Sequence, residues 1–106
     1  MTSPYPAPDN PMAVARQIIA EIFTGDNGEL LAAYCRGEWR ERQDDGTWSP
    51  MEEAEMRAHI YLMLEDAYFT CPLQRVSVPW NPDLQKVDNV LDAMAAALYT
   101  RRPPTA

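Results

Sequence analysis

The side chains that most often do chemistry in proteins are few in this chain and lie far apart. There is one histidine, His59, and there are two cysteines, Cys35 and Cys71, none of them at the CxxC or HxxxH spacing of a metal site. The sequence also lacks the GxxxxGK[ST] and GxGxxG loops that bind phosphate and the GxSxG turn that presents a nucleophilic serine. We therefore expect neither an enzyme nor a metal or other cofactor site.

The same residues have simpler structural interpretations. His59 lies beside the apolar stripe of a predicted helix, which indicates a packing or surface role. Two cysteines are too few for a disulfide framework, which indicates reduced thiols. The first residues form no apolar stretch like that of a signal peptide, and no run approaches the ~20 apolar residues of a membrane span. We expect a cytoplasmic protein that does not bind membranes.

The chain is strongly acidic. Sixteen acidic and nine basic residues give a formal net charge of -7, which opposes nucleic acid and anionic membranes and favours a basic protein partner. The candidate nucleic-acid contact, Arg36, Arg40 and Arg42, is interrupted by Glu38 and Glu41, so we expect weak or no DNA binding. Solvated turns and a helix start explain many acidic clusters. The residues that could instead form an acidic partner-binding face are Glu52, Glu53, Glu55, Glu65 and Asp66.

The stretch YCRGEWRERQDDGTWSP, residues 34–50, predicts a small antiparallel meander. Its turn signals, Gly37 and Asp45-Gly46, separate runs of strand formers. The two-residue alternation places Trp39 on the face opposite the arginines. We predict that Trp39 and Trp48 are mostly buried rather than free to stack on nucleobases. The expected strands are residues 30–35, 38–42 and 47–48.

Three segments carry apolar residues at helical spacing, and each follows a capping residue and a proline, as at the start of a helix. Residues 69–79 contain two prolines and predict a loop, with at most an extended stretch at residues 74–78. The predicted helices span residues 11–24 after Asn10, 50–68 after Ser49 and 82–100 after Asn81.

These elements predict an α+β fold in which three helices pack on a small antiparallel β-meander. A chain of 106 residues fits one domain. Closely spaced prolines near the start favour extended backbone, and the Arg-Arg-Pro-Pro sequence near the end terminates the last helix. We expect a proline-rich tail or linker at residues 1–10, a single domain at residues 11–100 and a C-terminal tail at residues 101–106.

The order and spacing of several residues resemble a known family. Residues 81–94, NPDLQKVDNVLDAM, are similar to a helix of that family in which a basic residue precedes Val-x-x-Val-Leu, and the likeness covers residues 30–99. The family is the helicase-associated domain that precedes the superfamily 3 ATPase in phage, plasmid and poxvirus primase-helicases. The residues that resemble its hairpin pattern are Tyr34, Gly37, Trp39, Gly46, Trp48 and Pro50.

This resemblance implies a non-catalytic α+β accessory module in DNA replication. Such a module would lie beside a hexameric helicase motor and help it to engage DNA or a partner. The chain departs from the family in two ways: it contains neither that ATPase nor a primase module, and its surface is acidic where a DNA-handling module is usually basic. These departures argue against DNA contact by this chain alone.

Two other interpretations stay open. A small acidic phage-encoded inhibitor, such as an anti-CRISPR protein or a DNA mimic, would use its carboxylates to block a basic nucleic-acid groove. A helical interaction module would form a homodimer through the methionine-rich face of the second predicted helix. The expected partner is a protein in each case: a helicase or other replication protein, a basic nucleic-acid-binding target, or a second copy of the chain.

Overall fold

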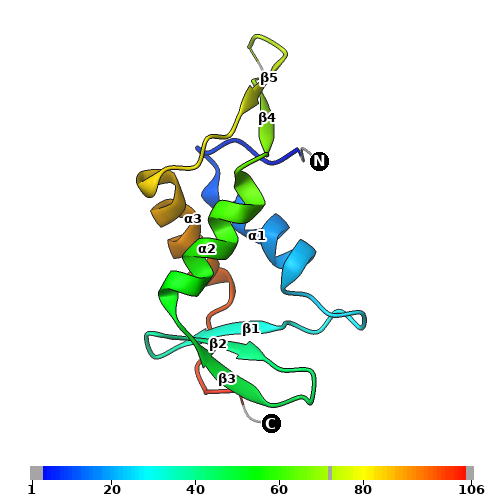
Figure 1. The fold of residues 1–106 in the computed structure, drawn as a ribbon, viewed down its shortest axis with the longest axis vertical. Coiled ribbons are helices and arrows are strands. Elements are labelled where there is room, and N and C mark those ends of the chain that lie inside the picture. The colour runs from blue at the N-terminus through cyan, green and yellow to red at the C-terminus, as the bar shows by residue number, and fades with distance from the viewer. Residues whose placement is uncertain (1–3, 72, 105–106) are drawn as a thin grey trace.

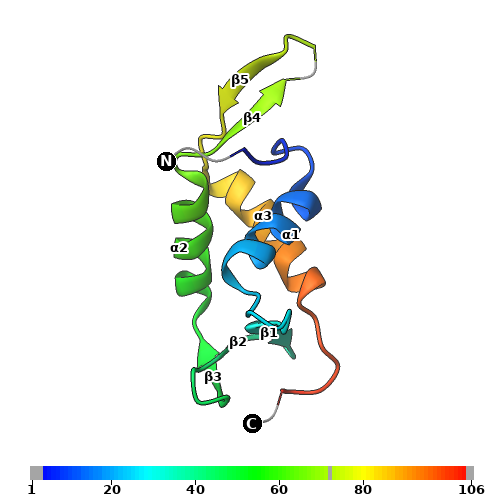
Figure 2. The same ribbon diagram turned by 90° about the vertical axis from the view of Figure 1, so that its right-hand side faces the viewer.

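The computed structural model describes residues 4–71 and 73–104 and shows the expected α+β fold (Figure 1). Within these residues there are two antiparallel sheets, of three and of two strands, which lie at opposite ends of a helical layer (Figure 2). The molecule is elongated, with extents of 48 × 27 × 20 Å. The elements follow the order α1 (Pro11–Ile22), β1 (Ala32–Cys35), β2 (Glu38–Arg42), β3 (Trp48–Met51), α2 (Glu53–Leu64), β4 (Tyr68–Cys71), β5 (Val76–Pro79) and α3 (Leu84–Ala97).

The core is formed mainly by one face of each helix. α3 packs against both α1 and α2. The side chains of Val14 and Ile18 from α1, Ile60 from α2, and Val87 and Met94 from α3 are fully buried together. The apolar stripes read from the sequence therefore meet in a single cluster, which also receives residues of the three-stranded sheet.

The first helix agrees most closely with its prediction. The Asn10 side chain accepts a hydrogen bond from the Ala13 N–H at 3.3 Å, and Pro11 occupies the first helical turn. α1 ends at Ile22, and the N–H of Phe23 closes the last turn. The predicted cap is confirmed, and the predicted end at residue 24 is too late.

The three-stranded sheet confirms the predicted meander. Its order is β1-β2-β3, with Trp39 of β2 directly opposite Tyr34 of β1. The β1–β2 turn has positive φ at both central residues, Arg36 and Gly37, which defines a type I′ hairpin turn. Gly46 also has a positive φ, of 87°, and reverses the chain between β2 and β3.

The tryptophans divide between the core and the surface. Trp39 is 5% exposed and belongs to the core cluster, which confirms its predicted burial. Trp48 is only partly buried and is not part of the core cluster, because it lies on the edge strand β3, opposite Arg42. Trp80, in the connection between β5 and α3, is fully buried.

The second helix begins later than predicted. Ser49 and Pro50 belong to β3, so no capping box forms, and α2 spans Glu53–Leu64 instead of residues 50–68, without a side-chain cap. The strand prevails because its extension carries Met51 into the core, where it is 5% exposed. Proline is tolerated there because β3 is an edge strand.

The third helix is capped by a different residue from the one predicted. It spans Leu84–Ala97 rather than residues 82–100, and the Asp83 side chain accepts a hydrogen bond from the Lys86 N–H at 2.9 Å. Asn81 has a left-handed conformation, with φ 48°, and lies outside the helix. The cap prediction for Asn81 is therefore wrong, because the aspartate that follows the proline satisfies the free N–H groups instead.

The segment predicted as a loop forms a second hairpin. β4 (Tyr68–Cys71) pairs antiparallel with β5 (Val76–Pro79), and this sheet extends beyond the helices at one end of the molecule (Figures 1 and 2). The loop prediction for residues 69–79 is wrong, because Pro79 lies in a strand with an open edge, where a missing N–H is tolerated. Leu73, near the hairpin tip, is 94% exposed.

The described part of the proline-rich segment, residues 4–10, packs against the domain. Tyr5 is 5% exposed, its N–H donates a hydrogen bond to the Tyr68 carbonyl at 2.9 Å, and its hydroxyl donates one to Glu21 at 2.6 Å. The Pro6 carbonyl accepts a hydrogen bond from the Trp80 indole at 3.1 Å. These contacts attach a segment expected to be a tail or linker, whose first three residues lie outside the described part.

The chain after α3 pairs with the outer edge of β1. The Tyr34 N–H donates a hydrogen bond to the Leu98 carbonyl at 3.0 Å, and the Thr100 N–H donates one to the Tyr34 carbonyl at 2.9 Å. Tyr99 thus forms a parallel bridge with Tyr34 and protects a strand edge. Of the predicted C-terminal tail, residues 101–104 are described, and the last two residues lie outside the described part.

Replacement of Trp39 by alanine should lower the free energy of unfolding by about 3–5 kcal/mol, because it leaves a cavity in the core. The Trp48→Ala change should have less than half of that effect, because this ring is only half-buried. Urea denaturation followed by circular dichroism measures both values. Equal losses in the two variants would contradict this difference in burial.

The Asp83→Ala change should destabilise the protein by about 1 kcal/mol, because it removes the cap of α3. The Ser49→Ala change should alter stability by no more than about 0.5 kcal/mol. Ser49 caps no helix, and among the described residues its hydroxyl accepts a hydrogen bond only from the exposed side chain of Gln43. Thermal denaturation of both variants tests the assignment. A larger loss for Ser49→Ala than for Asp83→Ala would argue against it.

The buried hydroxyl of Tyr5 should make stability fall at alkaline pH. Burial, followed by the hydrogen bond to Glu21 and the charge of that carboxylate, raises the pKa of Tyr5 above its ordinary value of 10.0. The unfolded tyrosine then ionises first, so the stability that Tyr5 contributes is complete below about pH 10 and falls above it. Between about pH 9 and 11, the free energy of unfolding should fall more steeply in the wild type than in Tyr5→Phe. Parallel urea-denaturation profiles would contradict this.

Candidate functional site

The three arginines considered as a nucleic-acid contact do not form a continuous basic surface. Arg36 lies in the turn between β1 and β2. Arg40 forms an ion pair with Glu38 at 3.1 Å, and 26% of its side chain is exposed. Arg42 lies at the far end of β2. A nucleic-acid strand would therefore meet separated cations, one of them already paired with a carboxylate.

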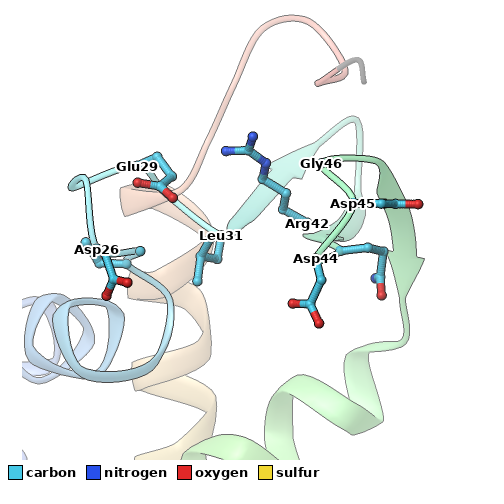
Figure 3. A pocket seen from close by; sticks show the side chains of 10 residues that line it. Asp26, Glu29, Leu31, Arg42, Asp44, Asp45 and Gly46 are labelled. Carbon is cyan, nitrogen blue, oxygen red and sulfur yellow. The ribbon is translucent and has the colours of Figure 1, made fainter.

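The hollow that contains Arg42 is mainly acidic (Figure 3). It has a volume of about 560 Å³, and its carboxylates come from the loop after α1, with Asp26 and Glu29, and from the β2–β3 turn. In that turn, the Asp45 carboxylate accepts hydrogen bonds from the hydroxyl and the N–H of Thr47, which lower the pKa of Asp45. Arg42 is the only basic residue among the described residues that line the hollow, so the lining does not favour an anionic ligand.

The residues of the candidate acidic face lie in two groups at the two ends of α2. Glu52, Glu53 and Glu55 lie at its start, and Glu65 and Asp66 follow its last residue. The helix has 12 residues and is therefore about 18 Å long, at a rise of about 1.5 Å per residue. The two groups are separated by roughly this length. A small ligand cannot contact both groups, whereas a protein that lies along the helix can.

Between these two acidic groups, α2 is apolar on two opposite sides. Its inward side fully buries Met56, Ile60 and Leu64. Because Met56 is part of the core, it is not available for the homodimer contact considered from the sequence. The exposed residues on the other side, here named the outer face of α2, are Ala54, Ala58, Tyr61, Leu62 and Glu65.

The outer face of α2 is open to solvent. Tyr61 is 36% exposed and Leu62 is 63% exposed. Figure 1 shows α2 in front of the other helices, and none of the drawn segments with a described placement crosses this side. Adjacent exposed apolar side chains bordered by charged ones are typical of a protein interaction surface.

A second surface lies where α3 meets the three-stranded sheet. Two adjoining hollows, of about 420 and 290 Å³, share Tyr34 of β1 and both Asp92 and Ala95 of α3. Tyr99 lines the larger hollow, and Trp39 lines the smaller one. We name these five residues the aromatic groove.

The fold holds the Tyr34 and Trp39 rings of the aromatic groove and the backbone of Tyr99. The Tyr34 and Trp39 rings pack with their centroids 4.7 Å apart and their planes tilted by 58°. Tyr99 is 61% exposed, and its backbone is fixed beside that of Tyr34 by the parallel bridge. Two tyrosine side chains therefore line one hollow from paired backbone segments, one of which is a strand of the sheet.

The charges around the aromatic groove are unequal. Glu53 and Asp88 border the smaller hollow, and the Arg57 guanidinium lies 3.4 Å from Glu53 and 2.6 Å from Asp88. The hydrogen bond to Asp88 raises the pKa of Arg57, so this cation is permanent. Asp92 has no ion pair or hydrogen bond of its side chain with any described residue. Three carboxylates and one guanidinium leave a net charge of -2 around the groove.

The residues that most often do chemistry are kept apart. His59 is half-buried and packs edge-on against Phe23, with the ring centroids 5.6 Å apart. Cys35 is buried, Cys71 is half-buried, and both are free thiols. Within residues 4–71 and 73–104, no three His, Cys, Asp or Glu side chains converge to hold a metal ion. No helix in the described ranges is long and apolar enough to cross a membrane.

Comparison of the chain with protein families, with curated proteins and with solved structures finds no match. The likeness to the helicase-associated domain therefore stays a prediction from the sequence. The features of the molecule that bear on its function are the outer face of α2, the aromatic groove and the placement of the charges.

Sequence reasoning located the acidic residues but missed both surfaces. A signal for the outer face of α2 was present, because the five consecutive apolar residues 60–64, IYLML, cannot all lie on one side of a helix. The aromatic groove had no comparable signal. Tyr34 and Tyr99 are far apart in the sequence and meet only through the pairing of the chain end with β1.

Proposed function

We propose that this chain is a non-catalytic protein-binding domain that docks through the outer face of α2. The observation that carries the proposal is the pair Tyr61 and Leu62, 36% and 63% exposed on a helix whose opposite side is fully buried. Exposure of these side chains brings no benefit to the isolated fold, whereas a partner would remove their apolar surface from water.

The charges around this surface define the kind of partner. Glu55 borders it near the start of α2, and at the other end Glu65 belongs to it and Asp66 borders it. An apolar centre with an acidic rim is complementary to a protein that offers an apolar groove between basic side chains. The apolar contact would provide most of the affinity, and the carboxylates would orient the complex and speed its formation.

The hairpin motif supports a replication context for this binding. Gly37 and Gly46 form the turns and Trp39 fills the core, so the residues that resemble the helicase-associated domain build the hairpin itself. The proposed partner is accordingly a helicase motor or another replication protein. The separation of Arg36, Arg40 and Arg42 favours a contact with protein over a contact with DNA.

A second candidate, a small acidic inhibitor of a nucleic-acid-binding protein, is favoured by the net charge of -7. In that role the two acidic groups of α2 would occupy basic sites that normally hold phosphates. The outer face of α2 would then matter less than the carboxylates beside it. The two candidates differ in how their binding responds to salt and to loss of Leu62.

The isolated chain should show no measurable binding to single-stranded DNA at about 50 mM salt, because its net charge opposes what three separated arginines contribute. Fluorescence anisotropy of a labelled oligonucleotide measures this. Micromolar affinity that is lost in an Arg36→Ala/Arg42→Ala variant would contradict the proposed mode of action.

A purified superfamily 3 helicase motor is the probe for the partner, and binding is measured by biolayer interferometry. Leu62→Asp should weaken binding at least about tenfold, because it places a charge in the apolar contact. Leu84→Asp is the matched control, because Leu84 is also 65% exposed but lies at the start of α3. Binding to the motor that both variants retain would contradict the proposed surface.

Salt separates the two candidates. Binding through the outer face of α2 should weaken by less than about tenfold between 50 and 500 mM salt, because salt screens the acidic rim but not the apolar contact. Binding that falls steeply with salt and survives Leu62→Asp would support the acidic inhibitor instead. The acidic-inhibitor candidate is tested in the same way, with a basic nucleic-acid-binding protein as the binding partner.

A further inference from the structure

We propose that the aromatic groove binds an arginine side chain of a protein partner. The proposal rests on the proposed function only in taking the partner to be a protein. The groove is formed by β1, β2, α3 and the chain after α3, and Glu53 and Arg57 of α2 border its smaller hollow. None of the residues that form the outer face of α2 lines either hollow. The two surfaces can therefore be tested separately.

The size and lining of the groove favour a side chain over a cofactor. Its larger hollow, of about 420 Å³, lies near the lower end of the range of roughly 300–1,000 Å³ typical of ligand sites, and its smaller one, of about 290 Å³, lies just below that range. Asp92 is the only charged residue among the described residues that line the larger hollow. A phosphate-bearing ligand would meet that carboxylate without a cation to balance it, whereas a cation is attracted.

The aromatic rings suit a flat cation. A guanidinium stacks on aromatic faces through cation–π attraction, and both Tyr34 and Tyr99 line the larger hollow. Tyr34 is held in place by the buried Trp39 ring, and Tyr99 is 61% exposed and therefore accessible. The Tyr34 ring therefore needs little ordering on binding, which favours affinity for a small group.

Asp92 supplies the second half of the recognition. Its exposed carboxylate has no partner among the described residues, so it is available to accept two N–H groups from one guanidinium. The neighbouring carboxylates of Glu53 and Asp88 already hold Arg57, whose guanidinium lies 2.6 Å from Asp88. The same region of the fold thus already contains one arginine bound by carboxylates.

The openness of the site selects arginine among the cations. A methylated lysine is recognised by aromatic rings that enclose the ammonium group on several sides. Here the larger hollow has two rings and one carboxylate at a seam between α3 and the sheet edge, which matches a planar group bound through its face and its edge. Lysine offers a point charge that uses only the carboxylate.

The test is a nuclear magnetic resonance titration of the labelled chain with the peptide acetyl-Gly-Arg-Gly-amide. Shifts should concentrate at the amides of Tyr34, Asp92, Ala96 and Tyr99. Matched peptides carry citrulline, lysine or trimethyllysine in place of arginine. Citrulline keeps the shape of arginine without its charge, so it should bind at least about tenfold more weakly, and lysine and trimethyllysine should also bind more weakly than arginine.

Two variants separate the groups of the site. Asp92→Asn and Tyr99→Ala should each weaken binding of the arginine peptide roughly two- to fivefold. Glu65→Gln and Tyr61→Ala make the same types of change on the outer face of α2 and should leave that binding unchanged. Circular dichroism verifies the fold, and Tyr99→Leu replaces Tyr99→Ala if the truncated variant does not fold.

Several results would overturn the proposal: equal binding of the citrulline peptide, tighter binding of the trimethyllysine peptide, or shifts confined to the outer face of α2. A concentration-dependent dimer in sedimentation that is lost in Arg101→Ala/Arg102→Ala would show that a second copy fills the groove instead of a different protein. Failure of the peptide to bind refutes the groove alone. Failure of Leu62→Asp to weaken motor binding refutes the docking surface alone.

Discussion

The whole fold depends on the helical core between its two sheets, because a two-stranded sheet is not stable by itself and the three-stranded sheet buries its apolar side chains in that core. The sheets have three and two strands, and small sheets need packing against other elements. Trp39 joins the larger sheet to this core, and Trp80 and Ala67 are buried beside the smaller one. Both proposed surfaces follow from that arrangement: one is the back of a helix whose front is buried, and the other is the seam between α3 and a sheet edge.

The sequence predicted the structure best where no other interaction opposed a local preference. The Asn10 side chain caps α1 as predicted, and turns at Gly37 and Gly46 give the meander its expected strand order. Ser49 was predicted to cap a helix but lies in β3 instead, because extension of that strand buries Met51. The hairpin of β4 and β5 was not predicted, because its prolines argue against strands. Proline is nevertheless tolerated at an open sheet edge, where no partner strand needs its missing N–H.

The candidate site was less predictable than the fold because its two surfaces depend on what the core leaves uncovered. The acidic residues at both ends of α2 were visible in the sequence, but the apolar strip between them required knowledge of which side of the helix is buried. The sequence showed that Glu38 and Glu41 interrupt the three arginines, but not that Arg40 is paired with Glu38 or that Arg42 lies among carboxylates. The two-residue alternation along a strand predicts which face a side chain occupies, but not which side chain it pairs with.

The hydrogen bond between the Trp80 indole and the Pro6 carbonyl joins residues 74 positions apart. A ribosome that adds about 5–20 residues per second needs roughly 4 to 15 seconds to synthesise the intervening chain. During that time the N-terminal segment has no binding site, and Tyr5 remains in water. Final closure of the domain must therefore wait for late synthesis, which leaves an interval in which chaperones or proteases can reach the nascent segment.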